Sequence, residues 1–72
     1  MSFIQTLERL KRIDALIRRK ATGTPAQLAE RLDVSEASLY RYLNDLKDLG
    51  APIKYCSQRL CYIYNAPFEL TF

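Results

Sequence analysis

The feature that most constrains this 72-residue sequence is a change of hydrophobic periodicity at Gly50. Before Gly50, apolar residues recur every three or four positions, which is the spacing of amphipathic helices. After Gly50, short β-prone stretches alternate with polar turn residues, which is typical of a hairpin. A chain of this length buries only about 60% of the surface that it exposes when unfolded, so its elements must share one thin core. We therefore expect a single domain over residues 1–72, mainly α with a small β-hairpin.

Three helices are predicted before Gly50. The first spans residues 3–20. Its apolar stripe consists of Ile4, Leu7, Leu10, Ile13, Leu16 and Ile17. The second and third helices lie within residues 25–49, because Thr24 and Gln27 fit a capping box and Ser35 suits the next N-cap. The apolar stripe of the third helix consists of Leu39, Leu43, Leu46 and Leu49.

A hairpin is predicted over residues 53–64, with Ser57-Gln58-Arg59 as its polar tip and Leu60 at the start of its second strand. Asn65-Ala66-Pro67 then interrupts the β-prone pattern. Residues 65–72 are expected to form an extended C-terminal arm or an edge strand. The apolar side chains of this arm, which would pack inward or against a partner, are Phe68, Leu70 and Phe72.

The two cysteines, Cys56 and Cys61, would approach each other if they faced across this hairpin. The N-terminal residues have neither the basic region nor the apolar region of a signal peptide. The longest apolar run, from Leu60 to Tyr64, is far too short to cross a bilayer. Because structural disulfides belong mainly to exported proteins, we expect reduced thiols in a cytoplasmic protein without a membrane anchor.

Three helices followed by a hairpin is the order of elements in a winged helix, in which the second and third helices form a helix-turn-helix unit. Such a unit needs a small residue where its helices cross, and Ala29 is suitably placed. Asp33 occupies the turn, where it tolerates a left-handed backbone better than most residues. The expected apolar contacts of the unit come from Leu28, Leu32, Val34, Leu39 and Tyr42.

The segment TPAQLAERLDVSEASLYRYL, from Thr24 to Leu43, resembles the type-11 helix-turn-helix domain, a winged-helix group shared by DeoR-like and biotin-repressor-like bacterial regulators. LKDLGAPI, from Leu46 to Ile53, resembles the junction between the third helix and the wing of that family. The sequence departs from the family at Tyr42, which replaces an acidic residue, and in the wing, which lacks glycines. The resemblance implies that the third helix enters the DNA major groove by its N-terminal half, with the wing on the adjacent backbone or minor groove.

Several residue types at these positions suit contact with double-stranded DNA. Arg41 can make a bidentate hydrogen bond to guanine, and Ala37 can touch a thymine methyl group. Ser35 and Ser38 offer hydroxyl groups to phosphates, and Tyr40 can reach a phosphate or stack on a sugar. The full set of candidate DNA-contacting residues is Thr24, Ser35, Glu36, Ala37, Ser38, Tyr40, Arg41, Lys54 and Arg59.

Structural roles compete with several of these assignments. Arg41 can pair with Asp45 four residues later instead of meeting a base. Glu36 can accept a hydrogen bond from cytosine, or it can stabilise the positive end of the helix dipole. The basic run Arg18-Arg19-Lys20 can approach phosphates or stabilise the C-terminus of its own helix. The hairpin tyrosines favour cross-strand packing over stacking on bases.

The charge and the lack of histidine bear on whether the protein is an enzyme or a binding protein. The chain has 11 Lys and Arg, eight Asp and Glu and no His, which gives a formal net charge of +3. Without histidine it lacks the commonest general base and the commonest zinc ligand, so we expect neither an enzyme nor a metal or other cofactor. No small-molecule ligand is evident. A small bacterial transcriptional regulator is favoured, as a homodimer through helix one and the C-terminal arm; the alternative is a protein-docking module without DNA binding.

Overall fold

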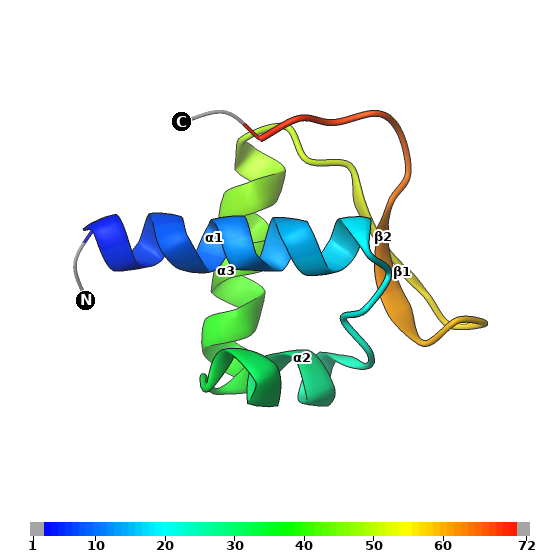
Figure 1. The fold of residues 1–72 in the computed structure, drawn as a ribbon, viewed down its shortest axis with the longest axis horizontal. Coiled ribbons are helices and arrows are strands. Elements are labelled where there is room, and N and C mark those ends of the chain that lie inside the picture. The colour runs from blue at the N-terminus through cyan, green and yellow to red at the C-terminus, as the bar shows by residue number, and fades with distance from the viewer. Residues whose placement is uncertain (1–2, 71–72) are drawn as a thin grey trace.

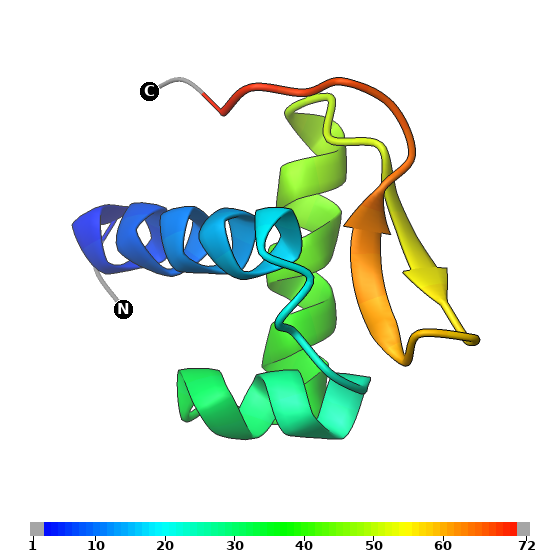
Figure 2. The ribbon, with the colours of Figure 1, turned by 45° about the vertical axis from the view of Figure 1, so that its right-hand side comes forward.

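The computed structural model describes residues 3–70 and contains three helices followed by a two-stranded antiparallel hairpin (Figure 1). The elements are α1 (Phe3–Arg18), α2 (Pro25–Leu32), α3 (Glu36–Asp48), β1 (Ile53–Cys56) and β2 (Cys61–Tyr64). α1 crosses α3, α2 lies at the N-terminal end of α3, and the hairpin lies on the other side of α3 from the N-terminus of α1 (Figures 1 and 2). The predicted fold class, mainly α with a small hairpin, is confirmed.

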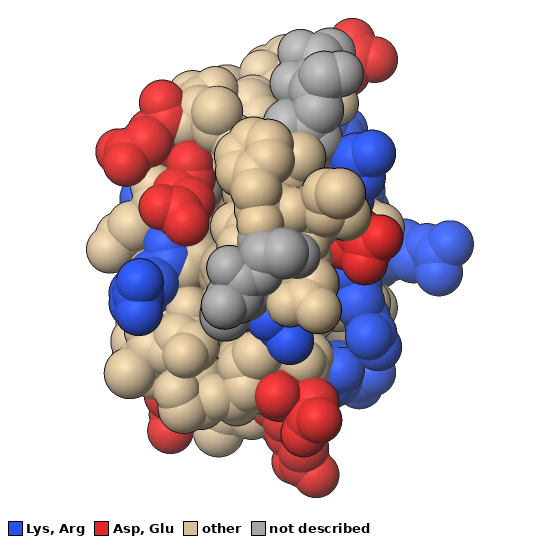
Figure 3. Space-filling model, turned by 90° about the vertical axis from the view of Figure 1, so that its left-hand side faces the viewer, with Lys and Arg blue, Asp and Glu red and all other residues tan. Residues whose placement is uncertain are grey.

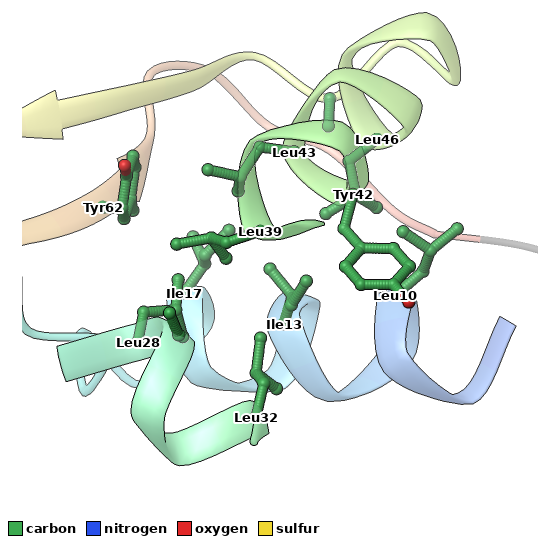
Figure 4. Packing of buried hydrophobic residues seen from close by; sticks show 12 residues of the cluster. Leu10, Ile13, Ile17, Leu28, Leu32, Leu39, Tyr42, Leu43, Leu46 and Tyr62 are labelled. Carbon is green, nitrogen blue, oxygen red and sulfur yellow. The ribbon is translucent and has the colours of Figure 1, made fainter. Parts of the chain in front are cut away.

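One hydrophobic core joins all three helices to the hairpin (Figure 4). Ile13, Leu28 and Leu39 have no exposed surface, and Ala29 is 4% exposed on the side of α2 that meets α3. Leu49 was expected in the apolar stripe of α3, but its side chain is 51% exposed. Helix α3 ends at Asp48, and Leu49 serves as the C-cap outside the core. The labelled core residues are Leu10, Ile13, Ile17, Leu28, Leu32, Leu39, Tyr42, Leu43, Leu46 and Tyr62.

Local side-chain and backbone interactions define the helix ends. The capping box at α2 is present, because Thr24 Oγ1 accepts from the Gln27 amide at 3.3 Å while Gln27 Oε1 accepts from the Thr24 amide at 2.9 Å. The left-handed backbone predicted at Asp33 is also found, with φ 57°. α1 ends at Arg18 rather than at residue 20, since Lys20 has a left-handed φ of 56° that ends the helical path. None of the described helices is both long and apolar enough to span a membrane.

The hairpin pairs Tyr55 with Tyr62 and Cys56 with Cys61. Both cysteine thiols are free, although the two residues face each other across the strands. Leu60 was expected in the second strand, but it lies in the turn with φ 53° and a 55% exposed side chain. The strand therefore begins at Cys61, because the backbone must reverse its direction over the preceding residues.

Thr22 connects the hairpin to the helical part of the molecule through a buried hydrogen bond. Its side chain is fully buried, and its Oγ1 accepts a hydrogen bond of 2.8 Å from the Tyr62 amide. The rings of Tyr55 and Tyr62 then pack edge to face, with their centroids 5.1 Å apart. Tyr55 and Tyr62 therefore pack across the strands, as expected from the sequence.

The C-terminal arm folds back on its own chain as far as the structure describes it. Residues 65–70 form no strand, and Phe68 and Leu70 pack, half-buried, against the core. The Arg18 guanidinium donates to the Phe68 carbonyl oxygen, and the Phe68 ring contacts the Tyr64 ring. Phe72, the third apolar residue of the predicted arm, lies outside the described residues.

Candidate nucleic-acid interface

The side of α3 that faces away from the core is open to solvent. Because Leu39, Tyr42 and Leu43 are buried against the other elements, the residues between them in the helical repeat point outward. We call this side the outward face of α3. Its exposed residues are Ala37, Tyr40, Arg41, Asn44 and Asp48.

Arg41 lies in the second turn of α3 with an exposed side chain. Among residues 3–70 it forms no ion pair, although Asp45 lines the same shallow hollow of about 330 Å³. The competing role of Arg41 as the ion-pair partner of Asp45 is therefore absent from this structure. The guanidinium retains donors that can make a bidentate contact.

The first turn of α3 is organised by its two serines. Ser35 is the N-cap, and its Oγ accepts from the Ser38 amide at 3.1 Å. The Ser35 hydroxyl also donates to Ser38 Oγ at 3.1 Å, so only the Ser38 hydroxyl keeps a proton for an outside acceptor. Glu36 is exposed in the first turn, where its charge suits the positive end of the helix dipole.

The hairpin lies beside the N-terminal half of α3. Burial raises the pKa of Tyr62, and the nearby Tyr40, Tyr55 and Glu36 raise it further. Tyr40 and Glu36 belong to α3. Tyr62 of the hairpin is therefore close enough to the N-terminal half of α3 to feel the charge of both residues. Tyr40 is 47% exposed at this junction.

The remaining predicted residues occupy separate places. Lys54 is exposed on β1, and Arg59 is exposed in the turn of the hairpin. Thr24 is half-buried at the N-terminus of α2, where its hydroxyl already serves the capping box. The structure thus brings the candidates of α3 together at the N-terminal half of that helix. Lys54 and Arg59 lie apart from them on the hairpin, and Thr24 has a capping role.

The basic residues of α1 lie away from the outward face of α3. α1 packs against the buried side of α3, and its own exposed side points further out (Figure 1). Figure 3 shows more basic side chains on its right than on its left, with acidic side chains on both sides. Arg18 is occupied by Asp14 at 3.1 Å and lies 5.3 Å from the centroid of the Tyr64 ring. Its role is to hold α1 to the hairpin and the arm.

Asn44 is a candidate that the sequence reasoning missed. It is exposed on the outward face, one turn beyond Arg41 and two turns beyond Ala37. An asparagine side chain can make a bidentate hydrogen bond to adenine in the major groove. Its spacing of three and seven residues from Arg41 and Ala37 was the signal that could have identified it.

A three-helix core, a hairpin beside the N-terminal half of α3 and an open outward face define a winged helix-turn-helix domain. A family model described as an HTH domain, of type 11, matches residues 7–59. The chain belongs to this family of DNA-binding helix-turn-helix domains, which confirms the resemblance seen in the sequence. The match ends in the turn of the hairpin, before β2. Neither the curated proteins nor the solved structures gave a match.

Membership of this family supports a DNA-binding regulator in general, with DNA as its partner. Domains of this kind are typically not enzymes.

Proposed function

We propose that the protein is a sequence-specific DNA-binding protein, a small bacterial transcriptional regulator that acts in the cytoplasm, where the bacterial chromosome lies. The observation that carries this proposal is the exposed outward face of α3, on which Arg41 has no partner among residues 3–70. The family supports the general partner, DNA, and the chemistry of this face supports contact with bases.

In the proposed complex, the N-terminal half of α3 lies in the major groove. Arg41 donates to the edge of a guanine, Ala37 faces a thymine methyl group, and the Ser38 hydroxyl donates to a phosphate. The C-terminal half of α3 stays outside the groove, because Asp45 and Asp48 would be repelled by phosphates.

The hairpin adds contacts that do not depend on base sequence. Lys54 and Arg59 are exposed, and the hairpin lies beside the N-terminal half of α3. Their charges suit the phosphates that flank the groove. Tyr40, at the junction of helix and hairpin, is placed to meet a phosphate or a sugar. The role of the protein is binding alone, since a chain without histidine lacks the commonest proton-transfer group.

The proposal extends to a homodimer on pseudo-palindromic sites. One small DNA-binding domain makes few base contacts, and a dimer doubles the length of sequence that is recognised. A two-fold symmetric dimer matches the symmetry of such a site. Helix α1 supplies the surface for this contact in the proposal.

The test is the salt dependence of binding, measured by electrophoretic mobility shift on double-stranded DNA. If about four phosphates are contacted, affinity should fall roughly 100-fold between about 50 and 200 mM salt. Replacing Lys54 or Arg59 with Gln should lower the slope of log affinity against log salt by about 1. A flat salt response would contradict the proposal.

A protein-docking domain is the second candidate, because the C-terminal half of α3 carries Asp45 and Asp48 on exposed positions. A docking domain would bind no DNA at any salt concentration, whereas the proposed regulator binds at low salt even when the sequence is random.

A further inference from the structure

Three of the large apolar side chains that remain exposed belong to one end of the molecule. Phe3 is 75% exposed and Ile4 is 67% exposed at the N-terminus of α1, and Leu49 is 51% exposed at the end of α3. Phe3 and Leu49 line the same hollow, so the N-terminal turn of α1 and the C-terminal end of α3 meet there. Exposed apolar residues that gather in this way mark interaction surfaces, whereas scattered ones do not.

The hollow at this end has a volume of about 350 Å³. Its floor and walls are mostly apolar, and Asp45 and Asp48 form its charged border. We call this region the end face. Its residues are Phe3, Ile4, Thr6, Leu7, Leu10, Asp45, Asp48 and Leu49.

Opposite charges border the end face on its two sides. Figure 3, which views the molecule from the N-terminal end of α1, shows acidic side chains at the upper left, with basic side chains below them, and most of the basic side chains on the right. The acidic border belongs to α3, where Asp45 and Asp48 are exposed. On α1, exposed Lys11 follows Ile4 and Leu7 along the same side of the helix, so it borders the end face from the other direction.

We propose that the end face binds the end face of a second copy of this chain. In a two-fold symmetric contact, a point on one side of the axis meets the point of the other copy that lies equally far on the other side of the axis. With that axis parallel to α3, the acidic border of one copy meets the basic border of the other. Asp48 of each protomer then lies against Lys11 of its partner, while Phe3, Ile4 and Leu49 are buried between them.

This arrangement accounts for one feature that DNA binding leaves unexplained, and it is compatible with DNA binding. Asp45 and Asp48 are unfavourable beside phosphates, and in the dimer they face basic residues instead. The hairpin and the N-terminal half of α3 stay free, because the hairpin lies on the far side of α3 from the N-terminus of α1 (Figures 1 and 2). The inference deepens the homodimer in the proposed function, but it is tested without DNA.

The experiment measures molar mass by sedimentation equilibrium on the full chain over a range of concentrations. The wild-type chain should show a monomer–dimer equilibrium with a Kd on the order of tens of micromolar, as a contact smaller than a standard interface implies. Asp48→Lys alone and Lys11→Glu alone each place like charges across the contact. Each variant should therefore raise the Kd at least about tenfold.

Mixing the two charge variants supplies the sharpest arm of the test. In a heterodimer of Asp48→Lys with Lys11→Glu, both border contacts join opposite charges again. The equimolar mixture should therefore dimerise at a total concentration where each variant alone is monomeric. This result cannot come from misfolding of either variant, because a misfolded chain would not recover in the mixture.

A matched pair of substitutions tests the apolar centre. Phe3→Ser should weaken the dimer, whereas Leu60→Ser, which removes another exposed apolar side chain but from the hairpin turn, should not. A wild-type chain that stays monomeric to about 500 µM, well above a weak dimer Kd, would overturn both the dimer and its surface. A dimer that ignores all three end-face variants would overturn the surface alone, and neither result bears on DNA binding.

Discussion

At the scale of single residues, Arg41 concentrates the proposed sequence discrimination. It is the one arginine of α3, and its side chain is exposed on the outward face without an ion pair among residues 3–70. Arginine is suited to this role because its planar guanidinium matches the two acceptors of guanine. Lysine at the same position would keep the charge but lose the paired geometry.

Arg41→Ala should therefore cost about 1–3 kcal/mol on a preferred site and less on random DNA. Sites selected from a random pool and fluorescence titration on both DNAs provide the measurement. Arg12→Ala is the charge-matched control, because Arg12 is exposed on α1, which packs against the buried side of α3. Equal losses on preferred and random DNA would reduce Arg41 to a phosphate contact.

Asn44 gives a second residue-scale prediction. If it meets adenine one turn beyond Arg41, Asn44→Ala should remove the preference at one base position of the selected site and leave the others. Asn44→Asp should lower affinity for all DNA, since it adds a negative charge beside phosphates. A selected site that is identical for Asn44→Ala and the wild-type chain would contradict the assignment.

At the scale of elements, the hairpin is held by a small number of specific contacts. Thr22, in the loop before α2, accepts from the Tyr62 amide in the buried interior. Asp14 on α1 accepts from the Tyr64 hydroxyl at 2.6 Å. These two bonds join β2 to segments some 40 to 50 residues earlier in the chain. The position of the wing relative to α3 depends on them.

Thr22→Val should destabilise the protein by about 1–3 kcal/mol, because the isosteric side chain leaves the buried Tyr62 amide without its acceptor. The free energy of unfolding in urea and the hydrogen exchange of the Tyr62 amide are the two measurements. Thr22→Ser is the control, since it keeps the hydroxyl and loses only a methyl group. Protection of the Tyr62 amide should survive in Thr22→Ser and disappear in Thr22→Val, and equal protection in both would refute the anchoring role.

At the scale of the whole molecule, two hairpin tyrosines make stability depend on alkaline pH. Burial raises the pKa of both Tyr62 and Tyr64, and the bond to Asp14 raises that of Tyr64 further. The folded state thus favours their neutral forms, while in the unfolded chain they ionise near their ordinary pKa of about 10. Their contribution to stability is complete below pH 10 and declines as the pH rises from there towards the folded-state pKa.

The free energy of unfolding should therefore be nearly constant from pH 8 to about pH 9.5 and fall above pH 10. Tyr64→Phe should cost about 1 kcal/mol at neutral pH, from the lost hydrogen bond, and should show a smaller alkaline decline. Urea unfolding at each pH measures these values, and a profile for Tyr64→Phe that parallels the wild-type one would contradict the assignment.

Local sequence signals were sufficient to predict features that depend only on residues close together in the chain. The capping box of Thr24 and Gln27 and the left-handed turn at Asp33 were predicted because each depends on residues within four positions. Leu49 and Leu60 were assigned wrongly for the opposite reason. Leu49 continues the apolar pattern of α3 past the end of the helix, and Leu60 begins the apolar pattern of β2 one residue before the strand starts.

The sequence by itself determined the order of the elements, the helix-turn-helix unit and its family, because periodicity, caps and turn residues act over short distances. The tertiary structure alone decided how the faces of those elements are directed. It packed α1 against the buried side of α3, left Arg41 without an ion pair to Asp45, folded Phe68 onto its own core and exposed the end face. These outcomes depend on how the helices cross, and a crossing is set by packing between residues far apart in the chain.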